Sequence, residues 1–392
     1  MNIKKMKFFK YNNLFITIFL CILTSIPVYY VRITTPVDSD YGVHVKLAQN
    51  ILDSGVIELA TTSHPILHII IISVTKLTGG LIGLYASLFI LQLVVQGMIG
   101  AAVYYWIGDG TKKHWELWRV FSSVSVTLLA PFMILALEDG LFYFGYIGLA
   151  NYHNPTIHLL KPFALGCLIL AEKGLNRNSN NSLLIILSAT FIILSAGIKP
   201  NFALTFLPAL GIVFLYLLIT KQEFDKNMII WGFAVPSLLV LTIQYFGLYG
   251  NKDTNIAIIW APFIVKKAFS DFLFIKFLLS SLFVLQGLVV FRHQLLTDRI
   301  LLLGWIMFSI GIFQTYFLAE SGERMLHANF GWSGQIALFL LIVIILRKSL
   351  IFYFTDKIQS NLEKLAGLIT YSMHLAGGIA YYLYCLFSIH YR

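Results

Sequence analysis

The sequence has few charged residues and little cysteine. Only 12% of its 392 residues are Asp, Glu, Lys or Arg, whereas 58% are hydrophobic. Soluble domains contain about a quarter of charged residues, which cover their water-facing surface, so an ordinary soluble enzyme is excluded. Cys21, Cys167 and Cys385 all lie in apolar stretches, and there is no CxxC motif. A disulfide framework and a cysteine-based metal site are therefore excluded as well.

Long apolar runs make up most of the chain. A helix needs about 20 apolar residues to cross a bilayer. Runs of this kind fall at about 13–32, 81–106, 120–137, 157–172, 182–198, 202–220, 228–248, 271–291, 300–319, 335–346 and 366–388. The sequence thus predicts an all-α polytopic membrane protein with about eleven transmembrane helices in a single integral membrane domain, 1–392. The first run lacks a cleavage site and is expected to be a retained helix.

The net charge of +10 indicates basic residues at cytoplasmic helix ends and near lipid phosphates, and nucleic acid is not an expected partner. Orientation depends on the stretch HPILHIIIISVTKLTGG at 64–80. If this stretch does not span, about 17 of the 28 basic residues lie inside, but if it spans, that bias disappears. We therefore expect 64–78 to form an amphipathic helix at the outer interface. The outward segments are then 33–80, 138–156, 249–270 and 320–335, with a junction at 199–201.

The first outward segment carries an acidic motif. Asp38 and Asp40 follow the first span, and Tyr41–Leu52 has helical periodicity. Asp40 and His44 are one turn apart, so they can share a helix face. A carboxylate at the membrane boundary, with its pKa raised by desolvation, suits a general base. Simpler roles stay open, with Asp40 as the N-cap of this helix and Asp38 as a solvated loop residue.

The first 110 residues or so resemble the GT-C superfamily of polytopic glycosyltransferases. The resemblance lies in the order of elements: a basic N-terminus, a span, an outward acidic motif, a short amphipathic helix, the pair His64–Pro65, a second interfacial helix and a long second span. In protein O-mannosyltransferases, aminoarabinose transferases and oligosaccharyltransferases, an acidic residue of this first loop is catalytic. The resemblance implies a catalytic Asp40 with Asp38 as its partner, and His64 near the substrate. The WWDYG-type motif of oligosaccharyltransferases and the Asp–Glu pair of mannosyltransferases are absent.

The later outward segments carry further candidates for substrate binding. In 138–156 and the helix after it these are Asn151, His153, Asn154, His158 and Lys161. Because a charged side chain is costly among apolar residues, a polar cavity holding a sugar or phosphate is expected near His158 and Lys161. The aromatic residues of this segment are typical of an interfacial belt.

Two more groups suit a phosphate. Lys199 and Asn201 flank Pro200 at the start of a helix, where anions are favoured, although Lys199 alone could be a lysine snorkelling to water. The last outward segment contains Glu320, Arg324 and His327. The planar guanidinium of Arg324 suits a phosphate, and a salt bridge with Glu320 or Glu323 is the alternative.

Two other possibilities involve the outward residues. Lys252, Lys266 and Lys267 are expected to cap helices or meet lipid head groups rather than bind substrate. Six histidines are expected outside, so a divalent metal is possible, although no HExxH spacing is present and no cofactor is certain.

The predicted function is transfer of a sugar from a polyprenyl-phosphate-linked donor to an acceptor hydroxyl, with inversion, at the outer face of a bacterial inner or plasma membrane. Asp40, with Asp38 or His44, supplies the base, and Arg324, Lys199 and Lys161 neutralise the departing phosphate. The acceptor is a glycan, a lipid or a protein. A transporter or flippase of lipid-linked sugars, a non-catalytic assembly subunit, and a polysaccharide polymerase or ligase are the alternatives.

Overall fold

The computed structural model describes residues 3–35, 40–58, 64–108, 114–176, 181–250, 256–355 and 361–388. Almost all of its elements are helices. In chain order the elements are α1 (Ile3–Thr34), α2 (Asp40–Ser54), α3 (Ile66–Leu77), α4 (Leu84–Ile107), α5 (Trp115–Val126), α6 (Ala136–Asp139), α7 (Pro155–Asn176), α8 (Ser182–Ile198), α9 (Asn201–Ile219), η1 (Met228–Ala234), α10 (Val235–Tyr249), β1 (Ile258–Trp260), α11 (Ile264–Lys267), α12 (Leu273–Phe291), η2 (Arg292–Gln294), α13 (Arg299–Phe317), β2 (Leu318–Glu320), η3 (Gly322–His327), α14 (Gly331–Thr355) and α15 (Asn361–Phe387).

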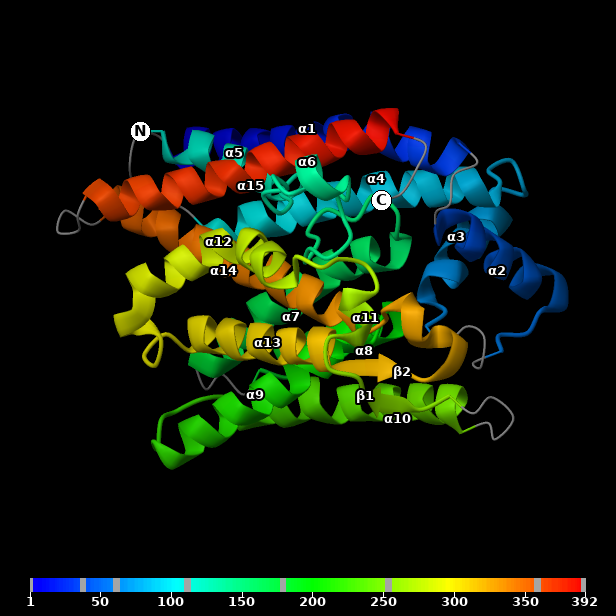
Figure 1. Ribbon diagram of the computed structural model, residues 1–392. Coiled ribbons are helices and arrows are strands. Elements are labelled where there is room, and N and C mark those ends of the chain that lie inside the picture. The colour runs from blue at the N-terminus through cyan, green and yellow to red at the C-terminus, as the bar shows by residue number, and fades with distance from the viewer. Residues whose placement is uncertain are drawn as a thin grey trace.

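The helices form a bundle. In Figure 1 the long helices run roughly across the view, with α2 and α3 at the right-hand end and the strands β1 and β2 toward the same side. The two strands pair antiparallel, with Ile258 opposite Glu320. This small sheet ties the segment before α11 to the segment after α13. Apart from these two short strands, the described elements are helices, and several of them are long and apolar enough to cross a membrane. The expected all-α polytopic architecture is confirmed at this coarse level.

Eight helical segments of the described chain are long and apolar enough to cross a membrane. They are 12–34, 84–107, 155–176, 201–219, 228–249, 273–294, 299–317 and 322–354. Helix α3, which covers most of 64–78, is too short to cross, with 12 residues, and α8 has 17. The remaining spans of the expected eleven stay a prediction, as does the assignment of the whole chain to one domain.

The expectation of one continuous span at 120–137 is wrong, because α5 ends at Val126. Pro131 lies in the irregular stretch that follows, and proline cannot donate a backbone hydrogen bond. Ala130 donates its backbone N–H to the carbonyl of His374 in α15 at 3.2 Å, and the His374 ring contacts the Ala130 carbonyl at 2.8 Å. Irregular backbone is tolerated at membrane depth only where protein satisfies it.

Glycine in α15 allows this close approach. A Cβ atom on Gly377 would lie 2.0 Å from the carbonyl oxygen of Pro131, and one on Gly378 would lie 1.9 Å from that of Leu128. No side chain fits at either distance. The stretch 127–132 is thereby held between α12 and α15, and it leads into α6 and the segment 138–156.

Ion pairs gather at the end of the bundle opposite α2 and α3. Arg347 pairs with Glu172 at 2.6 Å, and Lys348 pairs with Asp298. Asp298 also caps α13, because its carboxylate accepts the backbone N–H groups of Ile300 and Leu301. Arg347 and Lys348 thus pair with acidic residues at the ends of the neighbouring helices α7 and α13.

Candidate functional site

Two adjoining cavities lie at the end of the bundle that carries α2 and α3. The larger, which we call the carboxylate cavity, has a volume of about 510 Å³ and is lined by Asp40, His44 and His153 among others. The smaller, which we call the groove, has a volume of about 360 Å³. The apolar wall of the groove is built by α9 and α10. The two cavities share three lining residues, His64, Lys199 and Asn329.

Asp40 stands at the first turn of α2 and faces the carboxylate cavity. Its Oδ2 accepts a hydrogen bond from Nδ2 of Asn154 at 2.5 Å. Asn154 is itself fixed, because its Oδ1 accepts the backbone N–H of Ile157 at 3.0 Å and the hydroxyl of Thr156 at 2.7 Å. Asn154 thus caps α7, whose first residue is Pro155, a favoured residue at that position. The cap of one helix therefore orients the carboxylate of another.

Burial raises the pKa of Asp40 above its ordinary value of 3.8. The positive charge of Lys199 and the hydrogen bond from Asn154 act in the opposite direction, but desolvation is the larger effect. A carboxylate with a raised pKa binds a proton more readily than an exposed one. Asp40 therefore has the properties of a general base.

Lys199 projects into both cavities from the break between α8 and α9. The residue before a proline is disfavoured in helical conformation, and Lys199 is extended, with φ −164° and ψ 126°. Its ammonium group donates to the hydroxyl of Thr156 at 3.1 Å and lies 4.7 Å from the ring centre of Trp332. Lys199 is only 6% exposed, and burial lowers its pKa to about 8. It remains mostly cationic at neutral pH.

Three histidines lie in or just before helices α2 and α3. A ring nitrogen of His44 contacts one of His68 at 3.0 Å, which joins α2 to α3. Burial lowers the pKa of His44 well below 6.5, that of His64 to about 3 and that of His68 to about 4. These rings are neutral at pH 7, so they can hydrogen-bond to uncharged hydroxyl groups without adding charge. His44, a catalytic candidate, and His64, a candidate for substrate binding, both line the carboxylate cavity.

Glu320 forms the centre of a polar cluster at the rim of the groove. It accepts hydrogen bonds from the hydroxyl of Tyr249 at 2.7 Å and from Nδ2 of Asn329 at 2.6 Å, and it pairs with Arg324 at 3.2 Å. Asn201 donates to the backbone carbonyl of Asn329 at 2.8 Å. The salt bridge that the sequence left open for Arg324 is therefore present. Arg324 still lines the groove, and its side chain is 26% exposed.

The substitution Glu320→Ala is expected to destabilise the fold by about 1 to 2 kcal/mol, because it removes a buried carboxylate that accepts hydrogen bonds from the half-buried donors of Tyr249 and Asn329. The midpoint of thermal unfolding of the purified protein in detergent measures this effect. Glu323→Ala is the matched control, because Glu323 is exposed and lies three residues further on, in the short helix η3. Equal midpoints for the two variants would contradict the structural role of Glu320.

Aromatic and amide groups form another wall of the carboxylate cavity. The ring of Tyr143 meets that of His153 edge-on, with centroids 4.6 Å apart. Gln335 donates to the hydroxyl of Tyr143 at 2.6 Å and accepts from Nδ2 of Asn151 at 2.9 Å. The ring of Trp332 also lies near that of His153, at 5.6 Å between ring centres. Flat aromatic faces beside hydrogen-bonding groups suit the mixed polar and apolar surface of a sugar.

His158 and Lys161 line neither cavity, although the sequence suggested substrate contact for both. His158 contacts Gln92 and Gln96, each at 2.7 Å. Lys161 donates to the carbonyl of Leu149 at 2.6 Å. The polar partners expected for these two buried groups are thus protein atoms, which tie α7 to α4 and to the segment before α7.

His327 lines the carboxylate cavity from η3, as the sequence suggested. Asp38, the expected partner of Asp40, lies outside the described residues. No group of three or more His, Cys, Asp or Glu residues that could hold a metal ion occurs in the described ranges.

Sequence reasoning missed several residues at these cavities. Lys266 lines the carboxylate cavity, although we expected a helix cap or a lipid contact. Asn329, Gln335 and Tyr249 also lie at the two cavities. Gln335 and Tyr249 fall inside or at the end of apolar runs, and no local pattern marks them. Asn329 was visible in a polar outward segment but has no distinctive spacing.

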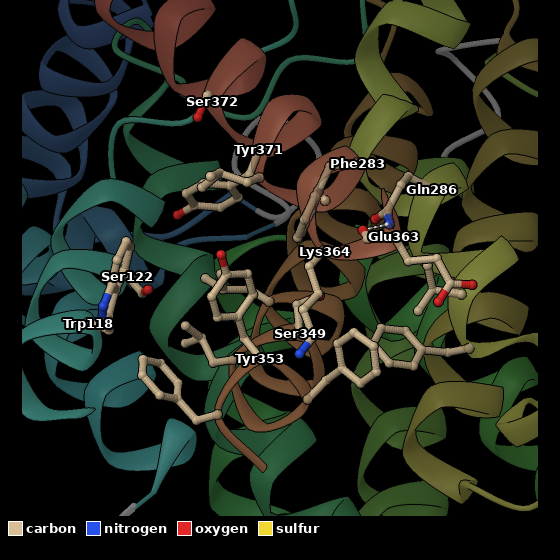
Figure 2. A pocket seen from close by; sticks show the side chains of 18 of the residues that line it. Trp118, Ser122, Phe283, Gln286, Ser349, Tyr353, Glu363, Lys364, Tyr371 and Ser372 are labelled. Carbon is tan, nitrogen blue, oxygen red and sulfur yellow. Dashed lines mark hydrogen bonds between the residues drawn. The ribbon is translucent and has the colours of Figure 1, made fainter. Parts of the chain in front are cut away.

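Figure 2 shows a third cavity, of about 280 Å³, between α5, α12, α14 and α15. Trp118, Tyr353 and Tyr371 are among its walls, and Nε2 of Gln286 donates to the backbone carbonyl of Glu363 at 3.3 Å. It contains none of the residues that the sequence singled out. Its location at the opposite end of the bundle separates it from Asp40.

Comparison of the sequence with protein-family models and with curated proteins finds no match. The chemistry of the site therefore has to be inferred from its own residues.

Proposed function

We propose that the chain is an inverting membrane glycosyltransferase of the GT-C type. It transfers a sugar from a polyprenyl-phosphate-linked donor to an acceptor hydroxyl, at the outer face of a bacterial inner or plasma membrane, in the assembly or modification of a surface glycan. The observation that carries the proposal is the shared edge of the two cavities. There, a polar chamber containing a base meets an apolar groove that ends at cations.

The groove suits the donor. Leu204, Leu238 and Leu241 give it an apolar wall among helices that are long enough to cross a membrane, so a polyprenyl chain can lie there without leaving the bilayer. Lys199 and Arg324 line the same space, and both can neutralise a phosphate. The sugar on that phosphate would reach the shared edge at His64 and Asn329.

The transfer step then uses Asp40. The acceptor oxygen attacks the anomeric carbon of the sugar while the carboxylate of Asp40 takes the hydroxyl proton. The bond between the anomeric carbon and the phosphate oxygen breaks, and the polyprenyl phosphate leaves with the electron pair. Lys199 and Arg324 stabilise the negative charge that develops on the phosphate. Attack from the side opposite the phosphate inverts the configuration.

The decisive experiment supplies purified protein with a panel of polyprenyl-phosphate and polyprenyl-diphosphate sugars and a membrane extract as the source of acceptors. We expect release of the lipid phosphate together with labelled sugar in the extract. A flippase would instead carry the intact donor across a vesicle membrane. Movement without release of the lipid phosphate from any donor would reject the transferase.

The pH dependence of transfer is a further prediction. Asp40 accepts a proton only when ionised, so activity should rise as pH increases through its raised pKa. Lys199 has a pKa of about 8, so activity should fall as pH rises above that value and its charge is lost. Initial rates from about pH 5 to about pH 9 measure this profile. A flat profile would contradict the roles of both charge types.

A further inference from the structure

Lys266 is a buried lysine in the carboxylate cavity that the transfer step does not use. It is 8% exposed and lies in the short helix α11. Its ammonium group has no hydrogen-bond or ion-pair partner in the part of the chain that the structure describes. Burying a charge is costly unless it is paired, so this arrangement calls for a partner that enters the cavity.

The fold holds Lys266 in this position. Val265, its neighbour, packs into a small apolar cluster with Ala261 and Ala319, behind the paired strands β1 and β2. Phe269, one turn further on, stacks on Phe144 with ring centres 5.0 Å apart, and both rings line the carboxylate cavity. The backbone on either side of Lys266 is therefore anchored by packing.

A glycine leaves room for the ammonium group. A Cβ atom placed on Gly331, at the start of α14, would lie 3.4 Å from Nζ of Lys266. Because Gly331 has no side chain, the space beside Nζ stays open to the cavity that both residues line. Burial lowers the pKa of Lys266 only to about 8, so the group is mostly charged at neutral pH.

The position of Lys266 separates it from the donor phosphate. Arg324 lines the groove, Lys199 lines both cavities, and Lys266 lines the carboxylate cavity alone. Asp40 is an acidic residue that lines the same cavity, but it already interacts with Asn154 and Lys199. An anion that reaches Lys266 therefore belongs to the molecule that fills the carboxylate cavity.

We propose that Lys266 binds an anionic group, a phosphate or a carboxylate, that is carried by the acceptor. The acceptor is then an anionic sugar-containing molecule rather than a neutral one. This inference rests on the proposed function, because that function assigns the carboxylate cavity to the acceptor. The hydroxyl that reacts lies toward Asp40, and the anionic group lies toward Lys266.

Binding of simple probes tests the proposal without turnover. Equilibrium dialysis of the purified full chain with labelled glucose 6-phosphate, glucuronate and glucose gives the Kd of each probe. Lys266→Gln should raise the Kd of the two anionic probes about tenfold, since a hydrogen bond to a charged group is lost, and should leave glucose unaffected. Lys266→Arg, which keeps the charge, should restore binding to within a few-fold.

Lys267 provides the matched control, because it is the next residue and is exposed. Lys267→Gln should bind all three probes as the unaltered chain does. Glucose 6-phosphate binding that is equal in Lys266→Gln and in the unaltered chain would overturn the proposal. A loss that is equal in the Lys266 and Lys267 variants would do the same, because it would indicate a general charge effect.

A second arm identifies the source of the anion. Binding of a polyprenyl monophosphate should weaken in Arg324→Ala and stay unchanged in Lys266→Gln. If Lys266→Gln weakens binding of the polyprenyl monophosphate as much as binding of glucose 6-phosphate, the anionic group belongs to the donor and the proposal is overturned. Absence of sugar transfer alongside Lys266-dependent binding would reject the proposed function and retain the anion site.

Discussion

Asp40→Asn is expected to lower the rate of sugar transfer by about 100-fold to about 10,000-fold, the range that a general base contributes. The amide is nearly the same shape as the carboxylate, and its oxygen can still accept the hydrogen bond from Asn154. What it loses is the capacity to take a proton. Initial rates of transfer at saturating donor and acceptor measure the loss.

The thermal stability of Asp40→Asn should not fall along with its activity. Asp40 is a desolvated carboxylate whose pKa is raised by burial, so a neutral amide at this position removes a costly charge. We expect a thermal midpoint equal to or above that of the unaltered protein. Asp53→Asn is the matched control, because Asp53 is an exposed aspartate of the same helix, α2. Transfer by Asp40→Asn at a near-normal rate would reject the catalytic assignment.

Lys199→Gln is expected to lower kcat by about 100-fold, the effect of removing one preorganised group that stabilises developing negative charge. It should also weaken donor binding, because Lys199 lines the groove as well as the carboxylate cavity. Steady-state rates over a range of donor concentrations separate kcat from KM. Lys76→Gln is the control, because Lys76 is exposed on α3 and lines neither cavity.

The same variant has a distinctive effect on pH dependence. The charge of Lys199 lowers the pKa of Asp40, so its removal should raise that pKa further and move the acid limb of the activity profile to higher pH. Lys199→Arg keeps the charge and should keep the acid limb in place. A purely structural lysine would change the amplitude of the profile without moving the limb.

The sequence predicted the helices well where one span is one continuous apolar run. Runs such as 202–220 became α9, and Pro200 located the break before it. The run at 120–137 failed, because hydropathy does not distinguish a helix from irregular backbone that is satisfied by other helices. The partners of Ala130 and Phe132 come from α15 and α12, and no local pattern around Pro131 points to them.

The residues of the candidate site could also be predicted only where a local sequence signal marks them. Asp40, His44 and Lys199 were found because each stands at a local signal, a helix start, a one-turn spacing or a Lys–Pro break. The same reasoning predicted that Lys161 contacts the substrate. Its ammonium group instead donates to the backbone carbonyl of Leu149, a contact that a single sequence cannot reveal. Lys266 was expected only to cap a helix or to meet lipid head groups. Its importance depends on Gly331 and on the pairing of β1 with β2, which are remote in the sequence.

The irregular stretch before α6 constrains the order in which the chain can assemble. Ala130 and His374, which satisfy each other, are 244 positions apart, and Phe132 depends on α12. As the chain is synthesised, the backbone N–H of Phe132 therefore lacks its native partner until α12 is made, and that of Ala130 until α15 is made. The segment 138–156, which supplies Tyr143, His153 and Asn154 to the carboxylate cavity, follows directly from this stretch. The stretch that leads toward the chamber around Asp40 thus makes all of its native contacts only after α15 has been made.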